Sequence, residues 1–213
     1  KSIRNKLYKG LIKLEYRGYD SSGISGSDVS SKLTTIKATG PIKNLRTKLT
    51  SLTRITTGIA HTRWATHGEP ILKNTHPHLS DNISIVHNGI IENHVELRSL
   101  LKKKQYTFRS DTDSEVISHL INMNYKKTKN METSIVLTSK MLKGSYAIGC
   151  INTDYPNTIF AACKGSPLII GKGINENFIA SDITPILSDT KHYITLDDDE
   201  FAKITPSKTL IFK

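Results

Sequence analysis

The stretch YAIGCINTDYPNTIFAACKGSPLIIG, residues 146–171, decides the fold class of this chain. It contains three short apolar runs, at 146–151, 158–163 and 167–171. The turn-forming tetrapeptide Asp154-Tyr155-Pro156-Asn157 separates the first two runs, and Lys172-Gly173 follows the third. Consecutive runs of this length with turn residues between them predict β-strands joined as antiparallel hairpins.

Outward from this stretch, the sequence alternates between further short strands and segments with helical spacing. In residues 1–16 apolar side chains recur at spacings of three and four, which predicts an amphipathic helix that ends at Gly18. The predicted helices are 1–16, about 113–126 and 132–143, and the further predicted strands are 55–61, 83–87, 178–181 and 193–196. Helices packed on antiparallel sheets predict an α+β fold, and no repeat or composition break divides the chain.

The composition is that of one folded domain. The chain has 213 residues, 37% of them hydrophobic, with 13 Gly and 7 Pro, so a disordered or fibrous class is excluded. No stretch of the sequence has about 18 consecutive apolar residues, the length that a membrane-spanning helix needs. The start, Lys1-Ser2-Ile3-Arg4, is not followed by a signal-peptide stretch. We therefore expect a cytoplasmic protein with no membrane partner.

Neither the net charge nor the two cysteines require a functional explanation. Lys plus Arg number 30 against 19 Asp plus Glu, a net charge of +11 that also occurs in nucleic-acid-binding proteins. The densest basic runs, 102–104 and 126–129, are not interleaved with aromatic residues, so we expect no nucleic-acid partner. Cys150 and Cys163 each lie in an apolar run, which is typical of buried structural thiols.

The first of three polar segments is IAHTRWATHGEP, residues 59–70, a strand that continues into a loop. Arg63 offers a fork of donors, Thr66 a hydroxyl group, and His67 a donor or an acceptor. Together they suit the α-carboxylate of an amino acid or a phosphate. The alternative is that both histidines of the segment are loop residues with satisfied hydrogen bonds and no functional role, and that Trp64 belongs to the core.

The second segment is VHNGIIEN, residues 86–93, in which Asn88-Gly89 follows an apolar strand. Asn-Gly is first of all a signal for a tight turn. Its functional alternative is an oxyanion site, because the Asn amide and an adjacent backbone N–H can point at one developing negative oxygen. Glycine would let the backbone approach that oxygen closely.

The third segment is SDTDSE, residues 110–115, which places three acids before an apolar helix. Helix capping and the helix dipole explain such a cluster without any function. An aspartate at this place can also pair with the ammonium group of a substrate. Both explanations stay open at the level of the sequence.

The sequence lacks the spacing of a metal site. His61 with His67, and His76 with His78, have no convergent set of cysteines or carboxylates around them in the sequence. There is also no Gly-rich phosphate loop and no nucleophile elbow. We therefore expect no metal ion.

Four motifs, taken in order, carry a resemblance to a known family. They are LEYRGYDSSG at 14–23, HTRWATHGEP at 61–70, HNGIIEN at 87–93 and SDTDSEVI at 110–117, and further matches follow at 142–147, 165–171 and 177–182. The chain resembles the class II glutamine amidotransferases, whose nucleophile is the N-terminal residue. The resemblance spans nearly all 213 residues.

The resemblance implies a fold and an activity. The fold is a four-layer αββα sandwich of the N-terminal-nucleophile hydrolase type, with antiparallel sheets. The activity is hydrolysis of L-glutamine to glutamate and ammonia without a cofactor, and the ammonia passes to a sugar-phosphate isomerase domain of a homo-oligomeric parent protein. Within the family, the motifs are most similar to the members that aminate fructose-6-phosphate in amino-sugar biosynthesis. Members that aminate phosphoribosylpyrophosphate are the alternative.

The resemblance also implies which residues hold the substrate. Arg63, Thr66 and His67 fall where the family holds the α-carboxylate end of glutamine. Asp113 falls where it holds the α-amino group, and Gly89 also lies against the substrate. These positions agree with the amino-acid-binding loop and the ammonium partner that the residues themselves suggest.

Further residues are implied around the reacting amide. Asn88 and Gly89 fall on the family's oxyanion hole. Arg17 and Gly18 match residues that line the pocket of the nucleophile. Trp64 matches a tryptophan that closes the glutamine loop and gates the passage of ammonia.

The sequence departs from the family at its start. The family's nucleophile is a cysteine whose own α-amino group moves the proton, whereas this sequence begins with Lys1. Neither Cys150 nor Cys163 can replace it, because both lie in later strands without a free α-amino group. Loss of the family's opening strand would leave an open position in a central sheet. We therefore expect an incomplete start, with a catalytically silent glutamine-binding domain as the alternative.

The sequence also ends at Lys213, after the glutaminase-like part and before any sugar-phosphate isomerase part. We expect residues 1–213 to form one glutaminase domain that lacks the first strand. Transfer of ammonia to a sugar phosphate would then belong to the parent protein.

Overall fold

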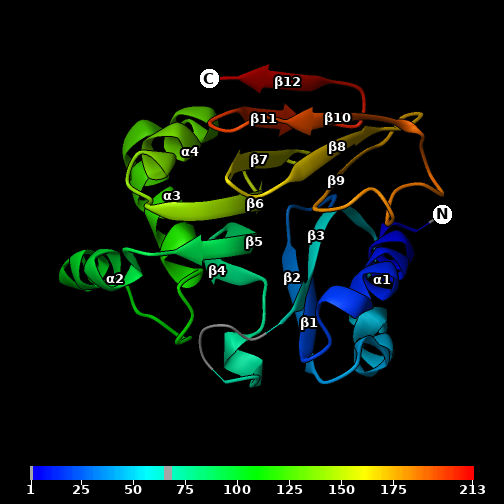
Figure 1. Ribbon diagram of the computed structural model, residues 1–213, viewed down its shortest axis with the longest axis horizontal. Helices are drawn as coiled ribbons and strands as arrows, with labels where there is room; N and C mark the ends of the chain where they lie inside the picture. Colours follow the sequence, from blue (N-terminus) through cyan, green and yellow to red (C-terminus); the bar gives the residue numbers. More distant parts are fainter. Residues whose placement is uncertain (1, 65–68) are drawn as a thin grey trace.

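The structure is a computed structural model that describes residues 2–64 and 69–213 (Figure 1). The helical elements of these residues are the α-helices α1 (Ile3–Leu14), α2 (His94–Lys103), α3 (Glu115–Thr128) and α4 (Met131–Ser139) and the 3₁₀ segments η1 (Glu15–Arg17), η2 (Ile42–Ser51) and η3 (Leu72–Asn74). No helix in the two described ranges is long and apolar enough to cross a membrane.

The strands of the described residues form three antiparallel sheets. The first has the order β2-β1-β3, with bounds β1 (Ser21–Asp28), β2 (Leu33–Thr39) and β3 (Ile55–Arg63). The second has the order β12-β11-β7-β6-β5-β4, with bounds β4 (His78–Ser80), β5 (Ile83–Ile91), β6 (Gly144–Asn152), β7 (Ile159–Lys164), β11 (Phe201–Ile204) and β12 (Thr209–Phe212). The third has the order β10-β8-β9, with bounds β8 (Leu168–Lys172), β9 (Asn177–Ala180) and β10 (His192–Leu196).

These elements stack in four layers. Helix α1 packs on β3 of the first sheet, and β3 in turn packs against β5 and β6 of the six-stranded sheet. Helix α3 packs on β4 and β5, and α4 packs on β7 and β11, which covers the opposite face of the six-stranded sheet (Figure 1). The order helix, sheet, sheet, helix is the predicted αββα sandwich.

Strands β6 and β7 show why short apolar runs predict the strands of this fold. Ile148 of β6 and Phe160 of β7 face the core shared with α3 and α4. Their neighbours Ala147 and Ala161 face a second core shared with β8 and β10. Both faces of these strands are therefore buried, which explains their apolar sequences.

The predicted boundaries differ from the observed ones in several places. The helix predicted at 132–143 ends at Ser139, and the strand predicted at 83–87 continues to Ile91. Elements that the sequence analysis does not predict are α2, β1, β2, β4, β11, β12 and the 3₁₀ segments. The predictions at 55–61 and 146–151 are confirmed, each with a short extension.

The sequence pattern does not predict strand β1, because the buried residues of this strand are small and mostly polar. Its sequence is SSGISGSD, in which seven consecutive residues are buried. The Oγ of Ser25 lies 2.8 Å from the Oγ1 of Thr35 on β2, so this buried hydroxyl is satisfied across the sheet. A Cβ at Gly23 would lie 2.1 Å from the carbonyl oxygen of His76, so only glycine permits this approach. Strand β1 therefore packs through close contacts of small residues rather than through large apolar side chains.

The two cysteines are structural, as predicted. Cys150 and Cys163 are buried free thiols. Burial raises the pKa of Cys150, and burial together with nearby carboxylates raises the pKa of Cys163 to about 11. Neither thiol therefore ionises readily near neutral pH.

Candidate functional site

Arg63 ends β3 with a buried guanidinium group. Its side chain is almost fully enclosed, with the residue 4% exposed, and Nη1 donates to the carbonyl oxygen of Glu69 at 3.2 Å. Burial lowers the pKa of Arg63, and the carboxylates of Asp20 and Asp113 oppose that effect. The structure therefore brings Arg63 and Asp113 into one electrostatic environment, although they are 50 positions apart in the sequence.

Asp113 lies just before α3 and is 5% exposed. Its Oδ2 accepts a hydrogen bond of 2.8 Å from the backbone N–H of Ile91, the last residue of β5. A buried cation and a buried anion near each other match the carboxylate and ammonium groups of an amino acid. Oδ2 of Asp113 does not cap α3, because the backbone N–H that it accepts belongs to β5.

Asn88 and Gly89 lie inside β5 and not in a turn, so the turn interpretation is wrong. Asn88 pairs with Ala147 and Gly89 with Tyr146 of β6. Gly89 has φ +137°, and a Cβ there would lie 2.2 Å from the carbonyl oxygen of Ser145. This backbone conformation and this contact require glycine. Asn88 is exposed and reaches a cavity.

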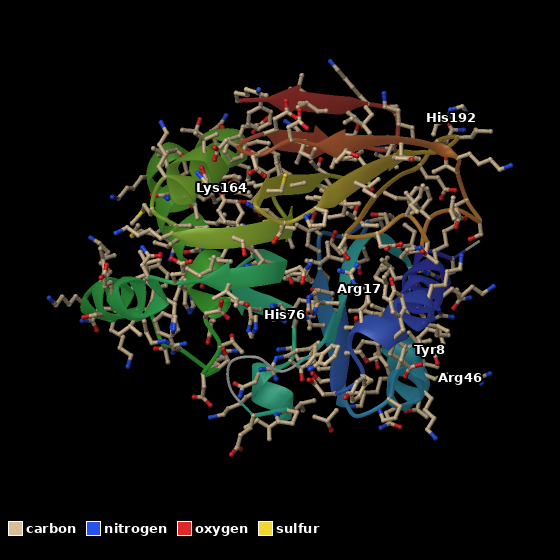
Figure 2. All side chains as sticks on the ribbon, in the orientation of Figure 1. Tyr8, Arg17, Arg46, His76, Lys164 and His192 are labelled. Carbon is tan, nitrogen blue, oxygen red and sulfur yellow. The ribbon has the colours of Figure 1, made fainter. Side chains whose placement is uncertain are left out.

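Arg17 and Gly18 follow α1 and lie beside the end of β3. A Cβ at Gly18 would lie 3.0 Å from the carbonyl carbon of Arg63. Arg17 Nη1 lies 3.8 Å from Asp182 Oδ2 and its side chain borders the same cavity as Asn88. Figure 2 labels Arg17 in the region between α1 and β3.

The cavity has a volume of about 400 Å³ and lies between α1, β3, β5 and β9. Residues of β3 and β9 line it from two sides. β3 is the last strand of its sheet and β9 is the last strand of the third sheet, so in the described part of the chain both edges lack a neighbour on this side. An unpaired edge on each side of one cavity provides backbone donors and acceptors for an additional strand.

Trp64 is exposed, so the interpretation of this residue as core is wrong. The side chain follows β3 directly and is 62% exposed. Its ring lies 5.9 Å from the ring of Tyr19, centroid to centroid. Thr66 and His67, which the sequence predicts to bind the substrate, lie outside the described residues.

Sequence reasoning missed a buried cluster of histidines behind the site. The rings of His61 and His76 lie 4.2 Å apart, and those of His76 and His78 lie 4.6 Å apart (His76 is labelled in Figure 2). Burial lowers the pKa of His61 and of His78 to about 3 each, and it lowers the pKa of His87 as well. The tripeptide His76-Pro77-His78 is the signal in the sequence that indicates this cluster.

Burial holds the pKa of His61, His76, His78 and His87 below the usual value for histidine. Within residues 2–64 and 69–213, no group of three or more His, Cys, Asp or Glu side chains is placed to hold a metal ion. His61 lies on β3 rather than in a loop, so its interpretation as a loop histidine is wrong.

Comparison with known proteins gives relatives over the whole chain. The chain is 48% identical over 218 residues to the glutamine–fructose-6-phosphate aminotransferase (isomerizing) of Wigglesworthia glossinidia brevipalpis, and 43% identical over 213 residues to that of Escherichia coli K12. Each alignment covers 100% of this chain and 35% of the relative. The chain thus spans about a third of the length of the curated relatives it matches.

A solved structure has the same fold. The glutamine phosphoribosylpyrophosphate amidotransferase from B. subtilis, complexed with ADP and GMP, superposes with a TM-score of 0.84 at 25% identity. The superposition covers 100% of this chain and 47% of that chain. This likeness confirms the α+β sandwich of the N-terminal-nucleophile type that the resemblance implies.

The family model described as a glutamine amidotransferase domain matches residues 61–188, which begin at His61 on β3 and include Arg63, Asn88 and Asp113. This match covers more than half of the chain and runs through the strands that border the cavity. Since the sequence relatives and the fold agree with it, the chain belongs to the class II glutamine amidotransferase domain family.

Proposed function

We propose that this chain is the glutaminase domain of an enzyme that aminates fructose-6-phosphate, and that it releases ammonia from L-glutamine for amino-sugar biosynthesis. The observation that carries the proposal is the convergence of Arg63 and Asp113 beside the strand that bears Asn88 and Gly89. Arg63 and Asp113 suit the carboxylate and ammonium groups of an amino acid. Asn88 and Gly89 suit the side-chain amide of glutamine. The names of the relatives support fructose-6-phosphate as the acceptor.

In this proposal the buried charges hold the substrate. The guanidinium of Arg63 binds the α-carboxylate of glutamine, together with Thr66 and His67. The carboxylate of Asp113 binds the α-amino group. Because both charged groups are almost fully buried, their interactions with a substrate are screened little by water.

The reacting amide lies at Asn88 and Gly89. A cysteine thiolate attacks the amide carbon, and the oxygen becomes negative while the amide of Asn88 and a backbone N–H at Gly89 donate to it. The C–N bond then breaks, ammonia leaves with the proton taken from the thiol, and a glutamyl thioester remains. Water hydrolyses the thioester to glutamate and restores the thiol.

We propose that the nucleophile enters on a strand that occupies the cavity between β3 and β9. The cavity is bordered by Arg17 and Asn88, two of the residues expected around the nucleophile and the reacting amide. Cys150 and Cys163 cannot serve, because both are buried with raised pKa values. In this proposal Trp64, which is exposed beside Tyr19, controls the release of ammonia toward an isomerase domain.

The second candidate function is the glutaminase domain of an enzyme that aminates phosphoribosylpyrophosphate. The TM-score of 0.84 to such an amidotransferase favours it. The higher sequence identity to the aminotransferases that act with fructose-6-phosphate favours the first. A further alternative is a catalytically silent domain that binds glutamine but lacks a nucleophile and does not hydrolyse it.

The deciding experiment uses the full-length protein, including any residues that precede Lys1 and follow Lys213. Glutamate and ammonia are measured with L-glutamine alone, with fructose-6-phosphate and with phosphoribosylpyrophosphate. Hexosamine phosphate formed only with fructose-6-phosphate supports the proposal. Amination of phosphoribosylpyrophosphate supports the second candidate, and glutamine binding without hydrolysis identifies a silent domain.

A further inference from the structure

Ser114 connects the proposed ammonium-binding carboxylate to a buried histidine. Its Oγ lies 3.4 Å from Oδ1 of Asp113 and 2.8 Å from Nδ1 of His87. All three side chains are buried. The Asp113 carboxylate is thus held on both oxygens, because Oδ2 accepts from the backbone N–H of Ile91 at 2.8 Å.

The direction of the hydrogen bonds follows from the groups involved. An ionised carboxylate only accepts, so the Ser114 hydroxyl donates to Asp113. The hydroxyl oxygen can then accept a hydrogen bond from Nδ1–H of His87. His87 also interacts with the backbone of Ser145, and this hydrogen bond opposes the lowering of its pKa by burial.

The same histidine anchors the strand that bears the oxyanion pair. His87 precedes Asn88 directly on β5, and successive side chains of a strand point to opposite faces. His87 is 3% exposed, whereas Asn88 is exposed. The hydrogen bond between His87 and Ser114 therefore joins the rear face of β5 to the start of α3.

We propose that Ser114 and His87 are positioning residues that direct the Asp113 carboxylate at the α-amino group of the substrate. This proposal rests on the proposed glutaminase function. Their effect is selectivity: the site prefers an α-amino acid amide to the same amide without an ammonium group. The Ser114 hydroxyl contacts His87 and Asp113, whereas the side chain of Asn88 points to the other face of β5.

The test compares L-glutamine with glutaramate, which is glutamine without its α-amino group, as substrates of the full-length protein. Ser114→Ala removes the hydroxyl, and Ser114→Thr restores one. Ser118→Ala is the matched control: it lies on α3, is equally buried, and its hydroxyl donates only to the Glu115 carbonyl oxygen, at 2.9 Å.

We expect Ser114→Ala to reduce the preference for L-glutamine about tenfold, which is the size of one charge-assisted hydrogen bond. The loss should appear in KM for L-glutamine, with kcat/KM for glutaramate nearly unchanged. Ser114→Thr should recover most of the preference, and Ser118→Ala should retain all of it. In an Asp113→Asn background, Ser114→Ala should lower the preference no further.

His87→Gln tests the second positioning residue and should lower the preference in the same direction. An unchanged preference in Ser114→Ala would overturn the proposal. An equal loss of kcat/KM for L-glutamine and for glutaramate, without recovery in Ser114→Thr, would also overturn the proposal. Such a result would indicate a purely structural role for Ser114. If the unaltered protein hydrolyses neither substrate, the proposed function is itself wrong and the positioning role is wrong with it.

Discussion

Gly18 rests directly on the backbone of Arg63. A Cβ at Gly18 would lie 3.0 Å from the carbonyl carbon of Arg63 and 3.1 Å from its carbonyl oxygen. The backbone N–H of Asp20 donates to that same oxygen at 3.3 Å. The segment after α1 and the end of β3 therefore hold each other in place, and the Arg63 side chain starts from that junction.

The first prediction concerns this junction. Gly18→Ala should raise KM for glutamine about tenfold, because three backbone atoms must shift and small displacements of a binding group are costly. The matched control is Gly10→Ala in α1, where a Cβ would meet only Pro185 Cβ at an ordinary 3.7 Å. That control should leave KM unchanged and raise the free energy of unfolding by about 0.5–1 kcal/mol. Steady-state kinetics and urea unfolding of both variants check this, and equal KM values would contradict it.

The second prediction concerns the proposed carboxylate site. Arg63→Ala should weaken glutamine binding by about 2–4 kcal/mol, because it removes a charge-assisted contact in a buried site. Arg46→Ala is the control, since Arg46 is exposed on η2 (labelled in Figure 2) and does not line the cavity. Isothermal titration calorimetry of both variants gives the affinities. An unaltered affinity in Arg63→Ala would show that the carboxylate binds elsewhere.

The third prediction concerns the oxyanion donor. Asn88→Ala should lower kcat about 10²- to 10³-fold with little change in glutamine binding, because the donor acts mainly in the transition state. The residue is exposed on β5, so stability should change little. Single-turnover kinetics in full-length protein measure the chemical step. A normal rate would exclude the role of Asn88.

The fourth prediction concerns pH and the buried histidines. The pKa of His61 and of His78 falls to about 3 in the folded state, chiefly because of burial, whereas the unfolded value is about 6.5. The unfolded chain therefore binds more protons as the pH falls. Stability is fully present above about pH 6.5 and is lost progressively toward pH 3, by about 2 kcal/mol for each histidine at pH 5.

Urea unfolding at pH 7.5 and at pH 5 checks the fourth prediction. His78→Gln should reduce the difference between the two free energies of unfolding, whereas the exposed His192 gives a matched control, His192→Gln, that should not. Equal stability at both pH values in the unaltered protein would contradict the prediction.

The sequence by itself determined the strands whose faces are apolar. In β6 and β7 the residues of both faces are buried in two different cores, and this burial produces the apolar runs that the pattern reveals. Helix α1 is predictable for a similar reason, because its apolar residues recur at helical spacing. The ordered motifs also indicated the family and the residues of the site.

Other features were decided only by tertiary structure. Strand β1 is built from small residues that close contacts with β2, β3 and His76 require, and such contacts leave no periodic pattern in the sequence. Asn88-Gly89 has the local signature of a turn, and only pairing with β6 makes it part of a strand. The closeness of Asp113 to Arg63 arises from packing between separate layers. Local preferences act over a few residues, whereas a site assembled from β3, β5 and the start of α3 depends on how distant segments pack.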